Sequence, residues 1–143
     1  MRTGNILWPT DFSDTASSAL RYAIEMANLY QGGIRILNVV GQPLGVENYM
    51  ILSITTEELA KDMEGTAASK MHELLAQLNT NLKIETVIRR GDAINEILSE
   101  ANSGVIGMVV IASHKRTGLS HFLHDSVAEA IANKADCPVL VVK

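Results

Sequence analysis

The chain contains 143 residues, of which 47% are hydrophobic and 20% are charged, a balance that predicts one globular domain over residues 1–143 and excludes wholesale disorder. A net charge of −4 and only 4% aromatic residues argue against a protein that coats nucleic acid, so we expect no nucleic-acid partner. The lack of a signal-peptide-like or membrane-spanning apolar run, together with a single cysteine, favours a cytoplasmic protein with no membrane partner.

A short apolar run at residues 6–8 predicts a first strand near the beginning of the chain. Apolar residues then recur at spacings of three and four over residues 16–30, which predicts a helix with one buried face. Ser13 or Asp14 has the chemistry to cap the start of this helix, and the glycine pair at 32–33 ends it.

Residues 34–40 form an apolar run that predicts a second strand. A second helix is expected to begin near Thr55, because Thr55 and Glu58 have the spacing of a capping box. Gly65 interrupts this helix and indicates a bend or a close contact. The apolar stripe of the helix consists of Leu59, Met63, Ala67, Met71, Leu74, Leu75 and Leu78.

The second half of the chain repeats the alternation of strand and helix. Polar and apolar residues alternate over residues 83–88, as in an edge strand with one solvated face. Asp92 is placed to cap the following helix. Residues 105–112 are almost wholly apolar, which predicts a central strand covered on both faces. A last helix over residues 126–133 and a last strand over residues 138–142 complete the pattern.

Five strands alternating with four helices predict an α/β fold with a parallel sheet and helices on both faces. Such sheets bind ligands beyond the carboxyl ends of the strands, at the point where the strand order reverses. We therefore expect three loops to meet there, at residues 9–13, 39–43 and 112–125.

Short motifs at the ends of the predicted strands and at the helix starts occur in a specific order along the chain. They are Asn5–Ser13, Arg90–Ala93, Ala112–Leu119, Asp125–Glu129 and Cys137–Val142. Together these motifs resemble the universal stress protein family. The resemblance implies a single-domain three-layer fold with a five-stranded parallel sheet of order 3-2-1-4-5. It also implies a non-enzymatic stress-response protein that acts as a regulatory or protective module, with protein partners that are unknown. A homodimer through the last strand, Val139 to Val142, is implied as well.

The resemblance is incomplete at the family's nucleotide-binding loop. Members that bind ATP carry Gly-x2-Gly-x9-Gly-Ser/Thr, and the matching positions here are Ala112, Lys115, Asp125 and Ser126. All three glycines are replaced, so the chain resembles the subgroup without an intact ATP motif, and no cofactor is expected. Asp125 argues most strongly against ATP binding, because its carboxylate would lie near the phosphates. Two like charges about 4 Å apart repel by roughly 4 kcal/mol at an effective dielectric of 20.

An adenine-nucleotide-binding switch is the alternative, with ATP or AMP and Mg²⁺ as ligand and weak ATP hydrolysis as a further activity. It would use the degenerate loop together with Asp11 and the backbone at Val39, since the family's matching aspartate contacts adenine. Asp11 also has a structural interpretation, as a loop residue that accepts backbone hydrogen bonds after the first strand.

The loop from His114 to His124 carries a second alternative. Its three histidines flank Lys115 and Arg116, so it is a candidate site for a small anion or a metal ion. The spacing matches no standard zinc signature, and a solvated basic loop explains it equally. No serine has the sequence context of a catalytic triad, so we expect no catalytic residues.

Overall fold

The computed structural model describes residues 3–41, 56–113 and 125–143. Strands and helices alternate through these segments, as the sequence pattern predicts. The sequence-based strand over residues 34–40 is confirmed to the residue, and the predicted strand over residues 83–88 extends to Arg90. The elements are β1 (Ile6–Pro9), α1 (Asp14–Leu29), β2 (Ile34–Val40), α3 (Thr56–Gln77), β3 (Ile84–Arg90), α4 (Ala93–Ala101), β4 (Met108–Ala112), α5 (Asp125–Lys134) and β5 (Val139–Val142).

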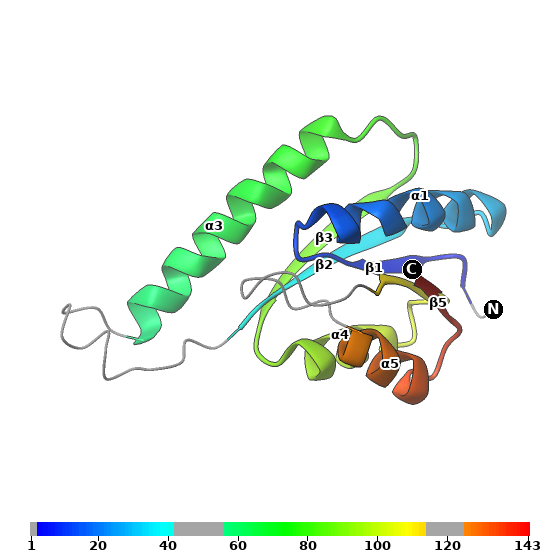
Figure 1. Cartoon of the computed structure of the whole chain (residues 1–143). Coiled ribbons are helices and arrows are strands. Elements are labelled where there is room, and N and C mark those ends of the chain that lie inside the picture. Colours follow the sequence, from blue (N-terminus) through cyan, green and yellow to red (C-terminus); the bar gives the residue numbers. More distant parts are fainter. Residues whose placement is uncertain (1–2, 42–55, 114–124) are drawn as a thin grey trace.

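All five strands pair in parallel in one sheet of order β3-β2-β1-β4-β5 (Figure 1), which confirms the expected α/β fold and strand order. The order reverses between β1 and β4, and β3 lies at one edge, as its alternating pattern predicts. The carboxyl ends of β1, β2 and β4 therefore lie at the same end of the sheet, where ligands of such folds bind.

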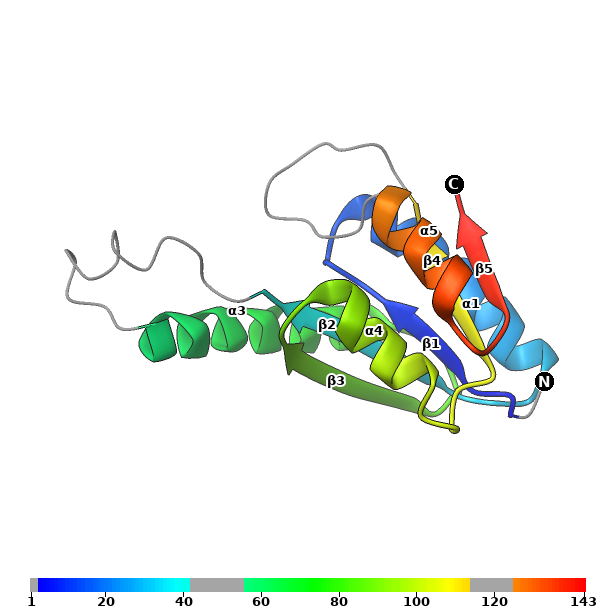
Figure 2. The same cartoon turned by 90° about the horizontal axis from the view of Figure 1, so that it is seen from below.

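Helices cover both faces of the sheet, with α1 and α3 on one side and α4 and α5 on the other (Figures 1 and 2). The layer under α1 and α3 includes Trp8, Ile36 and Val110, which are fully buried. The opposite layer includes Leu37 and Ile111, which pack with residues of α4 and α5. Each face of the sheet thus has its own apolar core.

Helix α1 lies close to the sheet because the residues on its buried face are small. Ala16, Ala19, Ala23 and Ala27 are fully buried there. Ser13 is the N-cap, as predicted, and its Oγ accepts a hydrogen bond from the Ala16 amide at 3.1 Å.

One predicted strand boundary was wrong, and so was one of the two roles expected of Gly65. The apolar run over residues 105–112 yields a strand only from Met108 onward, because the Val105 carbonyl accepts hydrogen bonds from the Thr3 and Asn5 side chains. A Cβ added at Gly65 would meet nothing within 4 Å, so this glycine marks no close contact. The Thr55 end of the predicted capping box lies outside the described residues.

None of the described helices combines the length and apolar character needed to cross a membrane.

Candidate functional site

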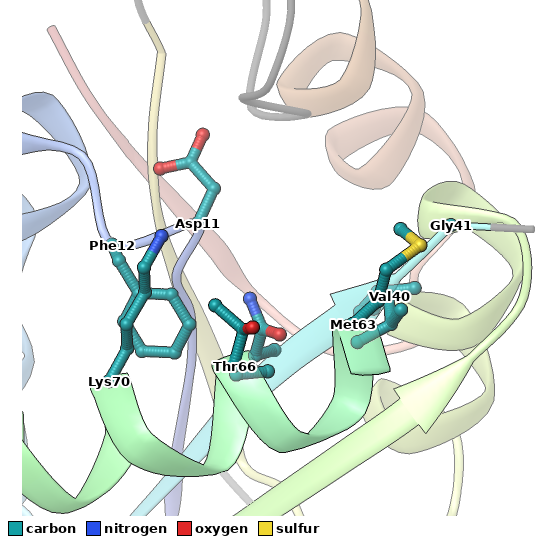
Figure 3. Close-up of a pocket in the computed structure, with 10 residues that line it drawn as sticks. Asp11, Phe12, Val40, Gly41, Met63, Thr66 and Lys70 are labelled. Atoms are coloured by element: carbon teal, nitrogen blue, oxygen red, sulfur yellow. The ribbon is translucent and has the colours of Figure 1, made fainter. Parts of the chain in front are cut away.

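A cavity of about 250 Å³ lies between the carboxyl ends of β1 and β2 and the overlying helix α3 (Figure 3). Strand β2 supplies its floor, the turn after β1 supplies one wall, and one face of α3 covers it. The described residues that line it are Asp11, Phe12, Asn38, Val39, Val40, Gly41, Met63, Thr66, Ala67 and Lys70.

Asp11 both lines this cavity and holds the turn that leads from β1 into α1. The residue is buried, and its Oδ1 accepts hydrogen bonds from the Ser13 amide at 3.0 Å and from the Ser13 hydroxyl. The Ser13 hydroxyl oxygen in turn caps α1. The structural interpretation of Asp11 is therefore confirmed, and it coexists with a place in the cavity wall (Figure 3).

The rest of the cavity floor combines apolar and amide groups. Val39 is buried and lines the cavity, and the nucleotide contact expected of its backbone stays a prediction. Asn38 is a buried polar residue between the apolar residues Leu37 and Val39, and its Nδ2 donates to the Thr10 carbonyl at 2.9 Å. That bond fixes the turn after β1 to the end of β2, so the cavity has a preformed floor.

Helix α3 contributes side chains that the sequence analysis did not identify as site residues. Thr66 and Lys70 both line the cavity. The Lys70 ammonium lies 5.9 Å from the centre of the Phe12 ring, within the range of a cation–π contact. The sequence does show that these two side chains share one face of the helix, because Thr66 and Lys70 are four residues apart and directly precede the apolar stripe positions Ala67 and Met71.

The remaining predicted binding residues lie at the end of β4 and the start of α5. Ala112 is fully buried, and Asp125 and Ser126 are the exposed first two residues of α5. The Ser113 hydroxyl donates to the Asp125 Oδ1 at 2.7 Å, so the carboxylate is tied to the end of β4. Its negative charge at the beginning of the helix is favoured by the helix dipole.

Some predicted binding residues cannot be placed in this geometry. Lys115 and the other residues of the His114–His124 loop lie outside the described residues. Among the described residues, no group of three or more histidine, cysteine, aspartate or glutamate side chains is arranged to hold a metal ion. The structure thus describes two parts of the expected site, the cavity beside Asp11 and the corner between Ser113 and Asp125.

The described cavity has the chemistry of a small-molecule binding site. Aliphatic and aromatic groups provide most of its lining, while Asp11 and Lys70 place one acidic and one basic side chain at its edge. A few convergent polar groups in a mostly apolar hollow are typical of sites that bind and orient a small ligand.

The chain is similar to known proteins over nearly its whole length. Residues 3–143 match the family model described as the universal stress protein family. The universal stress protein MJ0531 of Methanocaldococcus jannaschii is 33% identical over 96% of this chain and 81% of its own length. MJ0577 of the same organism is 29% identical over 96% of this chain and 93% of its own length.

Solved structures show the same relationship. The structure of MJ0577 covers 100% of this chain and 97% of its own, with a TM-score of 0.80 and 28% identity. A universal stress protein solved in complex with cAMP covers 100% of this chain and 99% of its own, with a TM-score of 0.60 and 18% identity. From its sequence, its strand order and these relatives, the chain belongs to the universal stress protein family.

Proposed function

We propose that this universal stress protein is a non-enzymatic regulatory or protective module of the cytoplasm that acts as a homodimer and works without bound ATP. The observation that carries the proposal is the hydrogen bond from Ser113 to Asp125. It holds a carboxylate at the start of α5, the position that the family resemblance assigns to the phosphates.

The corner between β4 and α5 is unfavourable for a triphosphate for two physical reasons. A helix start attracts phosphate through exposed amide groups and the positive end of the helix dipole, but here Asp125 supplies its own negative charge. The Ser113 hydroxyl could donate a hydrogen bond to a phosphate, but here it donates to that carboxylate instead. Both effects lower the affinity for ATP without altering the fold.

The homodimer is supported by the position of β5. This strand forms the free edge of the sheet, since β4 is its partner in the described structure. Its four residues are apolar and only half-buried. An exposed apolar edge strand favours pairing with a second copy of itself.

The role of Asp125 is tested by replacing it with two residues of different size. Asp125→Asn removes the charge and keeps the shape, whereas Asp125→Gly restores the residue type of ATP-binding members. We expect calorimetry with MgATP to show binding that is at least about tenfold tighter for Asp125→Gly than for the unmodified chain.

The matched control is Glu129→Gln, which removes one charge from an exposed position on the same helix. This control should leave the affinity for MgATP unchanged. If the unmodified chain binds MgATP as tightly as Asp125→Gly does, the carboxylate does not exclude ATP and the proposal is wrong.

The second candidate function is an adenine-nucleotide-binding switch, with ATP or AMP and Mg²⁺ as ligand and weak ATP hydrolysis as a further activity. The cavity beside Asp11 and Val39 favours it, because these two residues, both expected to contact a nucleotide, line the same hollow. The fold neighbour that holds cAMP shows that the fold accepts an adenine nucleotide. The switch is favoured over the first proposal if AMP binds to the unmodified chain and Asp125→Asn does not change its affinity.

A further inference from the structure

The cavity beside Asp11 has a neighbour on the other side of Phe12. A second hollow of about 320 Å³ lies between the start of α1 and the second half of α3. Phe12 and Lys70 line both hollows, so these two side chains form the partition between them. The other residues that line the second hollow are Thr10, Asp14, Ser17, Glu73, Leu74 and Gln77.

Phe12 has an unusual backbone conformation at this partition. Its φ is 64°, in the left-handed region that bulky residues rarely adopt. Its amide donates to the Thr10 hydroxyl at 3.0 Å, which holds the turn in this conformation. Strained residues of this kind concentrate at ligand sites, where they hold a side chain in a required position. Here the strain places an aromatic ring in the wall of the cavity.

Lys70 supplies the positive charge of this partition. Its ammonium lies over the Phe12 ring, and Figure 3 shows its nitrogen directed toward the end of the cavity at which Asp11 lies. In the described segments Lys70 forms no ion pair, although Arg35, Arg89 and Arg90 all do. Lys70 is also the one basic residue among the described residues of the lining.

The charged side chains around the site are not placed as the phosphates of a nucleotide require. The carboxylate of Asp125 occupies the corner at the start of α5, whereas the positive group lies on α3. A ligand that fits both features has its negative group at Lys70 and a ring between Phe12 and the apolar floor. Asp11 can accept an N–H from such a ring, since a carboxylate accepts several hydrogen bonds.

We propose that the cavity binds a small aromatic anion, with its ring against Phe12, Val40 and Met63 and its acidic group at the Lys70 ammonium. This inference extends the proposed function and rests on it only in taking the cavity to be free of ATP. A ring with an N–H donor and a carboxylate, such as an indole carboxylate, has the required chemistry and fits a volume of about 250 Å³.

The probe is indole-3-acetate, and its neutral analogue indole-3-acetamide is the matched ligand control. Protein-observed NMR titration should show saturable binding of the acid with a Kd of about 1 mM or tighter. The amide should bind about fivefold more weakly, because an exposed ion pair contributes little more than that. No saturation, or equal affinity for acid and amide, would overturn the proposal.

Substitutions of Lys70 test whether its ammonium causes the preference for the acid over the amide. Lys70→Met keeps the aliphatic stem and should abolish the preference for the acid over the amide, while Lys70→Arg should retain it. Lys61→Met removes another exposed lysine of α3 that does not line the cavity, and it should leave the preference intact. A preference that survives in Lys70→Met would overturn the assignment.

A parallel titration with MgATP separates this inference from the proposed function. Low-micromolar ATP binding contradicts the proposed function, whatever indole-3-acetate does. Absence of ATP binding together with absence of indole-3-acetate binding contradicts only the present inference. The buried indole of Trp8 serves as a check that each variant is folded, because its fluorescence differs between buried and exposed environments.

Discussion

Gly32 and Gly65 show how differently the same residue type is used in this chain. A Cβ at Gly32 would lie 1.9 Å from the carbonyl oxygen of Gly4, which is far inside van der Waals contact with backbone atoms. A Cβ at Gly65 would meet nothing within 4 Å, in the interior of α3. The first glycine permits a close approach of two chain segments, and the second only weakens a helix.

These surroundings predict opposite effects of the same substitution. Gly32→Ala should lower the free energy of unfolding by about 1–3 kcal/mol, because backbone must move to admit the methyl group. Gly65→Ala should raise it by about 0.5–1 kcal/mol through better helix propensity. Urea unfolding followed by Trp8 fluorescence measures both, and destabilisation by the two variants alike would contradict this account of Gly65.

At the scale of elements, Glu100 joins helix α4 to two strands. Its buried carboxylate accepts hydrogen bonds from Arg35 on β2 at 2.8 Å and from Arg89 Nε on β3 at 2.8 Å. Burial raises the pKa of Glu100, but the hydrogen bonds from these two guanidinium groups outweigh it and bring the pKa below the ordinary 4.5. The group therefore contributes stability above pH 4.5 that is lost as the pH falls through the folded-state pKa.

Removing the Glu100 carboxylate should change both the free energy of unfolding and the way in which it depends on pH. Glu100→Gln should lower the free energy of unfolding by about 2 kcal/mol at pH 7, because Arg35 and Arg89 lose the buried one of their charged partners. Each arginine keeps only a more exposed carboxylate, that of Glu85 or Glu96. The decrease in stability between pH 5 and pH 3 should also become shallower than in the unmodified chain.

The matched control for Glu100→Gln is Glu57→Gln, which removes an exposed carboxylate that pairs with Arg90. Exposed ion pairs contribute little, so this control should not change stability measurably. Unfolding in urea at a series of pH values tests both variants. Equal effects of the two substitutions would show that burial of Glu100 has no special importance.

For the whole molecule, the free edge at β5 predicts self-association. Light scattering at micromolar concentration should give twice the mass of one chain, because an apolar edge strand gains hydrogen bonds and burial by pairing. Val142→Lys places a charge on this edge and should yield monomers. Val105→Lys changes an exposed valine away from β5 and should leave the dimer intact. A monomeric mass for the unmodified chain at that concentration contradicts the proposed dimer.

Sequence patterns predicted the alternation of strands and helices well because its determinants are local, whereas the strand order was expected from the family resemblance. The alternation over residues 83–88 placed β3 at an edge, and Asp92 caps α4 as its position before an apolar helix suggests. The binding site was harder to predict, since it depends on contacts between distant segments. No local pattern reveals that Lys70 lies over Phe12, or that Asp125 accepts a hydrogen bond from Ser113.

The central claim is that this universal stress protein works without bound ATP, and calorimetric titration of the unmodified chain with MgATP tests it most directly. The account predicts no saturable heat of binding at micromolar concentrations of protein and nucleotide, because Asp125 holds a negative charge at the start of α5. Stoichiometric binding of ATP with a low-micromolar Kd would contradict it.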